Sequence, residues 1–170
     1  MTRTGIATFL SFFVYVLAQV LILQNLVLFN TAFCFLYIFF VLLLPKELSN
    51  LLLMLIGLVL GVSIDIFYNS LGLHALSLVL MAYLRNYWLA AITPQGGYDV
   101  GVPPSLSAYG LQWFLVYTFP LIFVHHFVVF FVEAAGFRLF WYTMLKVMMS
   151  LLFTLTVALI LQYLSMDRRR

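Results

Sequence analysis

Residues 48–67 read LSNLLLMLIGLVLGVSIDIF, and this stretch predicts a helix that crosses a lipid bilayer. Its length matches the roughly 20 apolar residues that an α-helix needs to span the hydrocarbon core. Gly57 and Gly61 stand four residues apart, so they share one face of the helix and let a neighbouring backbone approach closely. Asp65 follows one turn further along that face. We therefore predict a membrane helix that packs tightly against another and carries one carboxylate near its end.

The composition of the whole chain extends this prediction beyond one helix. Of the 170 residues, 66% are hydrophobic and only 8% are charged, whereas a soluble domain carries roughly 25% charged residues. Because this chain cannot cover itself with polar groups, lipid must be the solvent for most of its surface. The net charge of +3 does not indicate a nucleic-acid partner, since three of the basic residues are Arg168, Arg169 and Arg170 at the end of the chain.

Apolar runs separated by polar or helix-breaking residues predict six crossings within a single membrane domain, residues 1–170. The predicted spans are 4–23, 30–44, 48–67, 71–92, 110–132 and 137–164. A loop rich in glycine and proline, 93–109, joins the fourth span to the fifth. The predicted fold class is an all-α integral membrane protein, a compact bundle of six transmembrane helices.

The distribution of Lys and Arg predicts the orientation, because cytoplasmic loops carry an excess of these residues. If the N-terminus is inside, six basic residues lie at the cytoplasmic side: Arg3, Lys46, Arg85, Arg168, Arg169 and Arg170. Only Arg138 and Lys146 lie toward the other side. We therefore expect both termini in the cytoplasm.

Ionisable side chains inside a span are costly, so each one predicts a role. Counting along the predicted spans puts five of them in the outer half of the bilayer: Asp65, His74, His125, His126 and Lys146. We expect Asp65 to form a structural ion pair or hydrogen bond with Lys146 or a histidine. Adjacent helix residues point in different directions, so the histidine pair does not match a metal motif. No nucleophile motif or phosphate-binding loop accompanies these groups, and we predict no enzyme, metal or cofactor.

Two neighbouring segments resemble the central signature of the rod shape-determining protein MreD family. Residues 57–65, GLVLGVSID, close one predicted helix, and residues 71–76, LGLHAL, open the next. That family typically ends a helix with a Gly-x-x-x-Asp step and begins the following helix with Leu-Gly-Leu-His-Ala-Leu. Residues 94–98, PQGGY, and 125–127, HHF, extend the resemblance, which covers nearly the whole chain.

The resemblance implies a non-enzymatic scaffold subunit of the bacterial cell-elongation machinery in the cytoplasmic (inner) membrane, where it supports peptidoglycan synthesis and cell shape. The implied partner is MreC, a bitopic protein, in an assembly with MreB, RodA and a class B penicillin-binding protein. The implied fold is similar to the substrate-capturing subunits of energy-coupling-factor transporters. Gly61, Asp65, Gly72 and His74 would hold the hairpin between the third and fourth helices in shape.

Two other functions stay open on the residues alone. The polar outer groups could form the floor of a ligand pocket, as in a vitamin-binding subunit of a small-molecule transporter. Alternatively, Asp65, His125 and His126 could be the acid–base or metal-binding groups of an intramembrane enzyme that acts on lipid.

Overall fold

The structure is a computed structural model that describes residues 3–167, with side chains for residues 5–165. The described chain is mostly helical and contains six α-helices. They are α1 (Arg3–Leu21), α2 (Ile38–Leu42), α3 (Asn50–Tyr68), α4 (Leu73–Ala91), α5 (Leu106–Glu133) and α6 (Phe140–Asp167). A single 3-10 turn, η1 (Leu23–Asn25), and a hairpin of two short strands, β1 (Val27–Leu28) and β2 (Ala32–Phe33), separate α1 from α2. Among the described residues, four helices (α1, α3, α5 and α6) are long and apolar enough to cross a membrane, which indicates a membrane-embedded protein.

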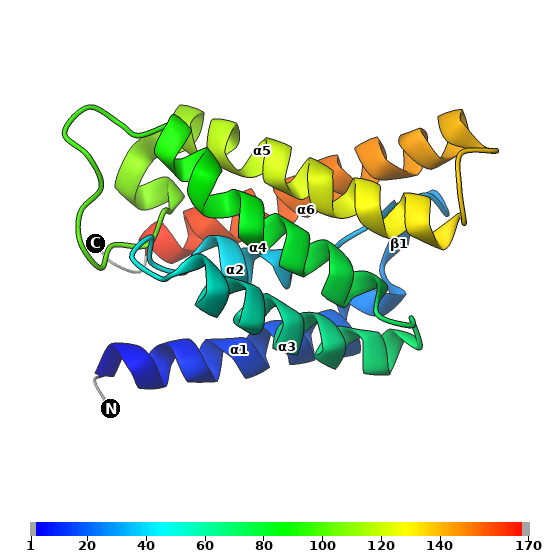
Figure 1. Cartoon of the computed structure of the whole chain (residues 1–170), viewed down its shortest axis with the longest axis horizontal. Helices are drawn as coiled ribbons and strands as arrows, with labels where there is room; N and C mark the ends of the chain where they lie inside the picture. The colour runs from blue at the N-terminus through cyan, green and yellow to red at the C-terminus, as the bar shows by residue number, and fades with distance from the viewer. Residues whose placement is uncertain (1–2, 168–170) are drawn as a thin grey trace.

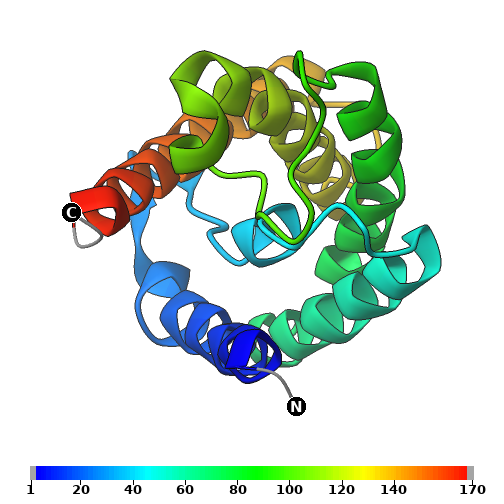
Figure 2. The ribbon, with the colours of Figure 1, turned by 90° about the vertical axis from the view of Figure 1, so that its left-hand side faces the viewer.

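The five long helices surround the short helix α2, which lies inside the ring that they form (Figure 2). Contacts run from α1 to α3, then to α4, α5 and α6, and α6 also packs against β2. The start of α1, the end of α6 and the connection between α4 and α5 lie at one end of the bundle, at the left of Figure 1. We call this the loop end. The opposite end, the hairpin end, carries the β1–β2 hairpin and the turns that join α3 to α4 and α5 to α6.

The predicted helix over residues 30–44 is wrong. This stretch forms the end of the hairpin, an extended passage and then the five residues of α2, and we call residues 31–44 the core segment. Almost every side chain from Ala32 to Leu44 is buried within the protein. A segment enclosed by other helices is as apolar as a helix facing lipid, so composition alone does not separate the two. Non-helical backbone is tolerated at membrane depth only where it is buried in protein or lines a water-filled cavity.

The turn between α3 and α4 is set by two residues in the left-handed region. Asn69 has φ +52° and ends α3, and Gly72 has φ +88° and begins α4. At the other end of α3, the hydroxyl of Ser49 accepts a hydrogen bond from the Leu52 amide at 3.3 Å, a helix N-cap. The two helices consequently lie antiparallel and side by side.

Candidate functional site

Gly61 brings the backbones of α3 and α4 into direct contact. A Cβ atom at this position would overlap Ala75 Cα and lie 2.6 Å from Ala75 N. At Gly57, one turn earlier, a Cβ atom would lie 3.3 Å from the Leu78 carbonyl oxygen, which is tight but not an overlap. Of the two glycines that the sequence predicts to be packing residues, Gly61 is therefore the one with no room for a side chain.

Asp65 stabilises the start of α4 from the end of α3. One carboxylate oxygen accepts from His74 N at 3.0 Å and from Ser70 Oγ at 2.6 Å, and the other accepts from Ala75 N at 2.9 Å. The first amides of a helix have no partner within it, and Gly72 at the N-cap has no side chain to supply one. A buried carboxylate also interacts favourably with the positive end of the helix dipole. Of the predicted partners of Asp65, His74 does bind the carboxylate, through its backbone amide and not its imidazole, whereas Lys146 pairs with Glu133.

Two of the predicted histidines meet at a tyrosine of the core segment. The hydroxyl of Tyr37 lies 2.6 Å from His74 Nδ1 and 2.9 Å from His125 Nε2, and all three side chains are buried. Because a hydroxyl has one proton, it donates to one imidazole and accepts from the N–H of the other. The bridge joins α4 and α5 through the centre of the bundle. Tyr37 was absent from the predicted site, although a tyrosine in a run of Phe, Leu and Ile is a signal that could have marked it.

Side chains of α6 bind the extended part of the core segment. Ser150 Oγ accepts from Phe33 N at 2.9 Å, and Thr154 Oγ1 accepts from Phe35 N at 3.0 Å. His126 lies beside them: its Nδ1 donates to the Ile122 carbonyl at 2.9 Å, and its Nε2 lies 3.2 Å from Thr154 Oγ1. These hydroxyls pair the backbone amides of Phe33, the last residue of β2, and of Phe35 just beyond it, which would otherwise be left without a partner.

The amide of Gln19 performs the same task from α1. Its nitrogen donates to the Cys34 carbonyl at 2.9 Å and to the Tyr68 hydroxyl at 2.7 Å, and its side chain is fully buried. Two buried side-chain polar atoms in the described part of the chain lack a partner, Gln19 Oε1 and His125 Nδ1.

Arg85 binds backbone carbonyls at the other end of the core segment. Its Nη2 donates to the carbonyls of Leu42 and Leu44, and its Nε donates to the Tyr117 hydroxyl at 2.9 Å. The Tyr117 hydroxyl in turn donates to the Leu42 carbonyl at 2.7 Å. These carbonyls lie at the C-terminal end of α2, where the helix dipole favours a positive charge. Arg85 was predicted as a charge at the cytoplasmic boundary, but it is fully buried inside the bundle.

Lys146 does not join the other predicted polar residues. Its ammonium lies 3.6 Å from a carboxylate oxygen of Glu133 and 5.0 Å from the centre of the Phe130 ring. The predicted outer cluster therefore divides into the His74–Tyr37–His125 bridge with His126 beside it, the Asp65 cap, and the separate Lys146–Glu133 pair. No group of three or more His, Cys, Asp or Glu side chains within residues 5–165 could hold a metal ion.

Most of these contacts satisfy the backbone of a segment that is not a continuous helix. The histidines act differently, because His74 and His125 bind the Tyr37 side chain and His126 lies against Thr154. Donors from α1, α4, α5 and α6 reach the core segment at its start, middle and end. An unsatisfied backbone group away from water costs several kcal/mol, so each contact has a large effect on stability. We call this set of contacts the polar layer; it comprises Gln19, Tyr37, His74, Arg85, Tyr117, His125, His126, Ser150 and Thr154.

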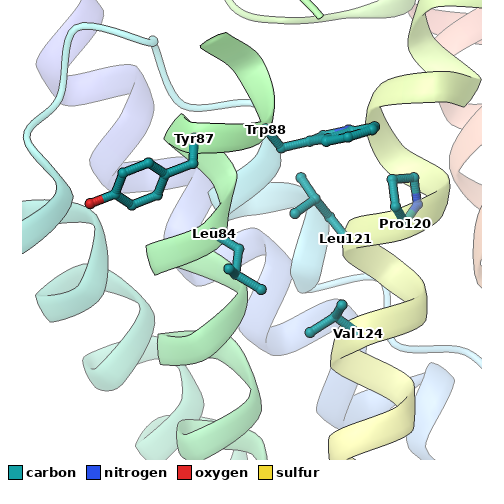
Figure 3. Close-up of a pocket in the computed structure, with 6 residues that line it drawn as sticks. All are labelled: Leu84, Tyr87, Trp88, Pro120, Leu121 and Val124. Carbon is teal, nitrogen blue, oxygen red and sulfur yellow. The ribbon is translucent and has the colours of Figure 1, made fainter. Parts of the chain in front are cut away.

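A hydrogen bond outside the polar layer compensates for a proline inside α5. Pro120 has no N–H, so the Val116 carbonyl lacks its usual helical donor. The indole N–H of Trp88 on α4 donates to that carbonyl at 3.1 Å. Figure 3 shows Trp88 extending from α4 toward Pro120, at the top of a groove of about 310 Å³ between the two helices.

We expect Trp88→Phe to lower the free energy of unfolding by about 1 kcal/mol, because it removes one hydrogen bond to a backbone carbonyl. The same change should cost less in a Pro120→Ala background, since alanine supplies an N–H to Val116 from within α5. A double-mutant cycle measured by unfolding in detergent gives the coupling between the two residues. If Trp88→Phe lowers the free energy of unfolding equally with proline or alanine at position 120, the Trp88 indole does not replace the missing N–H of Pro120.

No family model, curated protein or solved structure matches this chain.

Proposed function

We propose that this chain is a non-enzymatic membrane scaffold subunit of the bacterial cell-elongation machinery, and that it binds MreC. The observation that carries the proposal is the α3–α4 hairpin. Gly61, Asp65, Gly72 and His74, the residues on which the resemblance to the MreD family depends, all have packing, capping or hydrogen-bonding roles there. The polar groups of the interior are engaged in holding the bundle together, which supports a structural role for the chain.

We further propose six crossings, with the core segment as the second. The chain runs along α1 to the hairpin end, returns through the core segment to the loop end, and then passes four more times (Figure 1). An even number of passes supports placing both termini on one side of the membrane, and we propose that the loop end is cytoplasmic. Lys46 at this end supports that orientation. The predicted contributions of Arg3, Arg168, Arg169 and Arg170 lie outside the described side chains.

Binding to MreC would use the outer faces of the helices, because the described chain has little mass beyond the ends of the bundle. α1 has the least packed of these faces: no side chain from Gly5 to Tyr15 is buried. A single partner helix would gain affinity from close packing and interhelical hydrogen bonds, since the hydrophobic effect contributes little between helices in lipid. Association with MreB, RodA and a class B penicillin-binding protein would follow through the same assembly.

Co-purification of MreC with a set of tryptophan variants tests this proposal. Each variant enlarges one exposed position: Val14→Trp on α1, Val59→Trp on α3, Val116→Trp on α5 and Leu152→Trp on α6. We expect one variant to lose MreC in mild detergent while its folded yield and thermal stability stay at the wild-type level. Leu53→Trp, at a fully buried position, is the control for loss of folding.

Retention of MreC by all four surface variants would reject docking through these faces. If MreC fails to co-purify with the wild-type chain as well, the assignment to the elongation machinery fails. Native mass spectrometry of the same preparation distinguishes the transporter alternative, because a vitamin-binding subunit would retain a small molecule in stoichiometric amount.

A further inference from the structure

A short exposed stretch crosses the loop end of the bundle between two anchored points. We call residues 99–103 the strap; Asp99, Val100, Gly101 and Pro103 within it are exposed. Before the strap, the Tyr98 hydroxyl donates to the Leu89 carbonyl at 2.8 Å. After it, Pro104 and Leu106 are buried.

One side chain holds the middle of the strap. Glu47, which follows the core segment, accepts a hydrogen bond at its carboxylate from Gly101 N at 3.0 Å. Among the described residues, the strap makes one other hydrogen bond to the rest of the protein, from Asp99 N at its first residue to the Tyr109 hydroxyl at 3.3 Å. Hydrogen bonds from its own amide and from Gly101 hold the pKa of the Glu47 carboxyl below its usual range, so the group is charged at neutral pH.

The strap separates two cavities at the loop end. One, of about 490 Å³, lies beside α1 and is lined by Ala7, Ser11 and Tyr15 among others. The second, of about 340 Å³, lies beside α6 and is lined by Gln162. Both cavities are also lined by Leu43 of the core segment and by Pro103. Residues 101–103 are therefore the wall between the cavities, and Leu43 lies at its base.

We propose that the strap is a lid over a lateral opening between α1 and α6, and that Glu47 is its latch. Leu43 is half-buried with the strap in place; when the strap lifts, the two cavities join and Leu43 becomes more accessible from outside. The opening reaches the C-terminal end of α2, because Leu43 lies between the two residues whose carbonyls bind Arg85. This device does not depend on the identity of any partner, so it stands or fails apart from the proposed binding of MreC.

Thiol accessibility at position 43 tests the lid in the full-length protein. Leu43→Cys is labelled with a water-soluble maleimide in detergent, and the rate is compared with Val100→Cys, a fully accessible position on the strap. The native Cys34 is buried and provides the unreactive reference. We expect slow labelling at position 43 and an increase of about tenfold when Glu47→Gln weakens the charged hydrogen bond to Gly101.

Asp99→Asn is the matched control, because it removes a carboxylate from the strap itself. With this change added to Leu43→Cys, the labelling rate at position 43 should stay the same. Thermal unfolding of each variant separates local opening from loss of folding, because the exposed Glu47 side chain contributes little to the core. The latch is wrong if Glu47→Gln leaves the rate unchanged, or if Asp99→Asn raises it equally. The lid is wrong if position 43 already reacts as fast as position 100 with Glu47 intact.

Discussion

Gly61→Ala is expected to destabilise the protein by more than about 3 kcal/mol and to remove most of its folded yield. The added methyl group would overlap Ala75 Cα and lie 2.9 Å from the carbonyl carbon of His74. Both contacts are with backbone, which cannot rotate away as a flexible side chain could. The helices α3 and α4 must separate, and the separation stretches the bonds from Asp65 to His74 N and Ala75 N one turn further on. Packing and helix capping are therefore lost together.

Gly57→Ala is the matched control for this change. It adds the same methyl group to the same face of α3, where the nearest atom is the Leu78 carbonyl oxygen at 3.3 Å. A shift of a few tenths of an ångström accommodates it, so we expect a cost of about 1 kcal/mol or less. Size-exclusion chromatography in mild detergent gives the folded yield, and thermal unfolding gives the stability. Similar values for the two variants would show that the close approach at Gly61 is not required.

The long helices could be predicted from the sequence, because each requires only a sustained apolar run with polar residues or turn formers at its ends. The close approach of two helix backbones at Gly61 could also be predicted, since two glycines one turn apart in an apolar helix have few other roles. The non-helical path of the core segment could not be predicted. Its residues are as hydrophobic as a span facing lipid, and its non-helical backbone is satisfied by polar side chains on other helices. Ser150 and Thr154, more than a hundred residues away, replace the hydrogen bonds that a helix would have made internally.

The sequence predicted most of the residues of the candidate site, but not which of them bind one another. Depth along the helices placed His74, His125 and Lys146 in one half of the bundle, yet depth does not give the direction in which a side chain points. His74 and His125 face the interior and share Tyr37, whereas Lys146 faces Glu133 at the hairpin end. Asp65 was expected to bind Lys146 or a histidine, and its partners are the Ser70 hydroxyl and the backbone amides of His74 and Ala75. Backbone donors have no signature in the sequence, so such a cap is visible only in the fold.

Arg85→Met is expected to destabilise the protein by about 3 kcal/mol or more, because it removes the donors at the C-terminal end of α2 while keeping a side chain of similar length. The Leu44 carbonyl would lose the guanidinium that it binds, and the Leu42 carbonyl would keep only the Tyr117 hydroxyl. Each charged hydrogen bond contributes roughly 1.5–3 kcal/mol, and an orphaned buried carbonyl adds a desolvation cost. The loss should appear as a lower midpoint of thermal unfolding and as faster amide exchange in residues 38–44.

Two further variants separate the charge of Arg85 from its geometry. Arg85→Lys keeps the charge but replaces the planar fork with a single ammonium that cannot reach Tyr117 and both carbonyls at once, so it should recover only part of the stability. Arg138→Met removes an exposed arginine at the hairpin end and should change the stability by no more than about 0.5 kcal/mol. An Arg85→Met protein as stable as Arg138→Met would mean that the core segment holds its shape without this cap. In that case the hydroxyls of α6 and the Tyr37 bridge would be sufficient to hold a non-helical passage through the bundle.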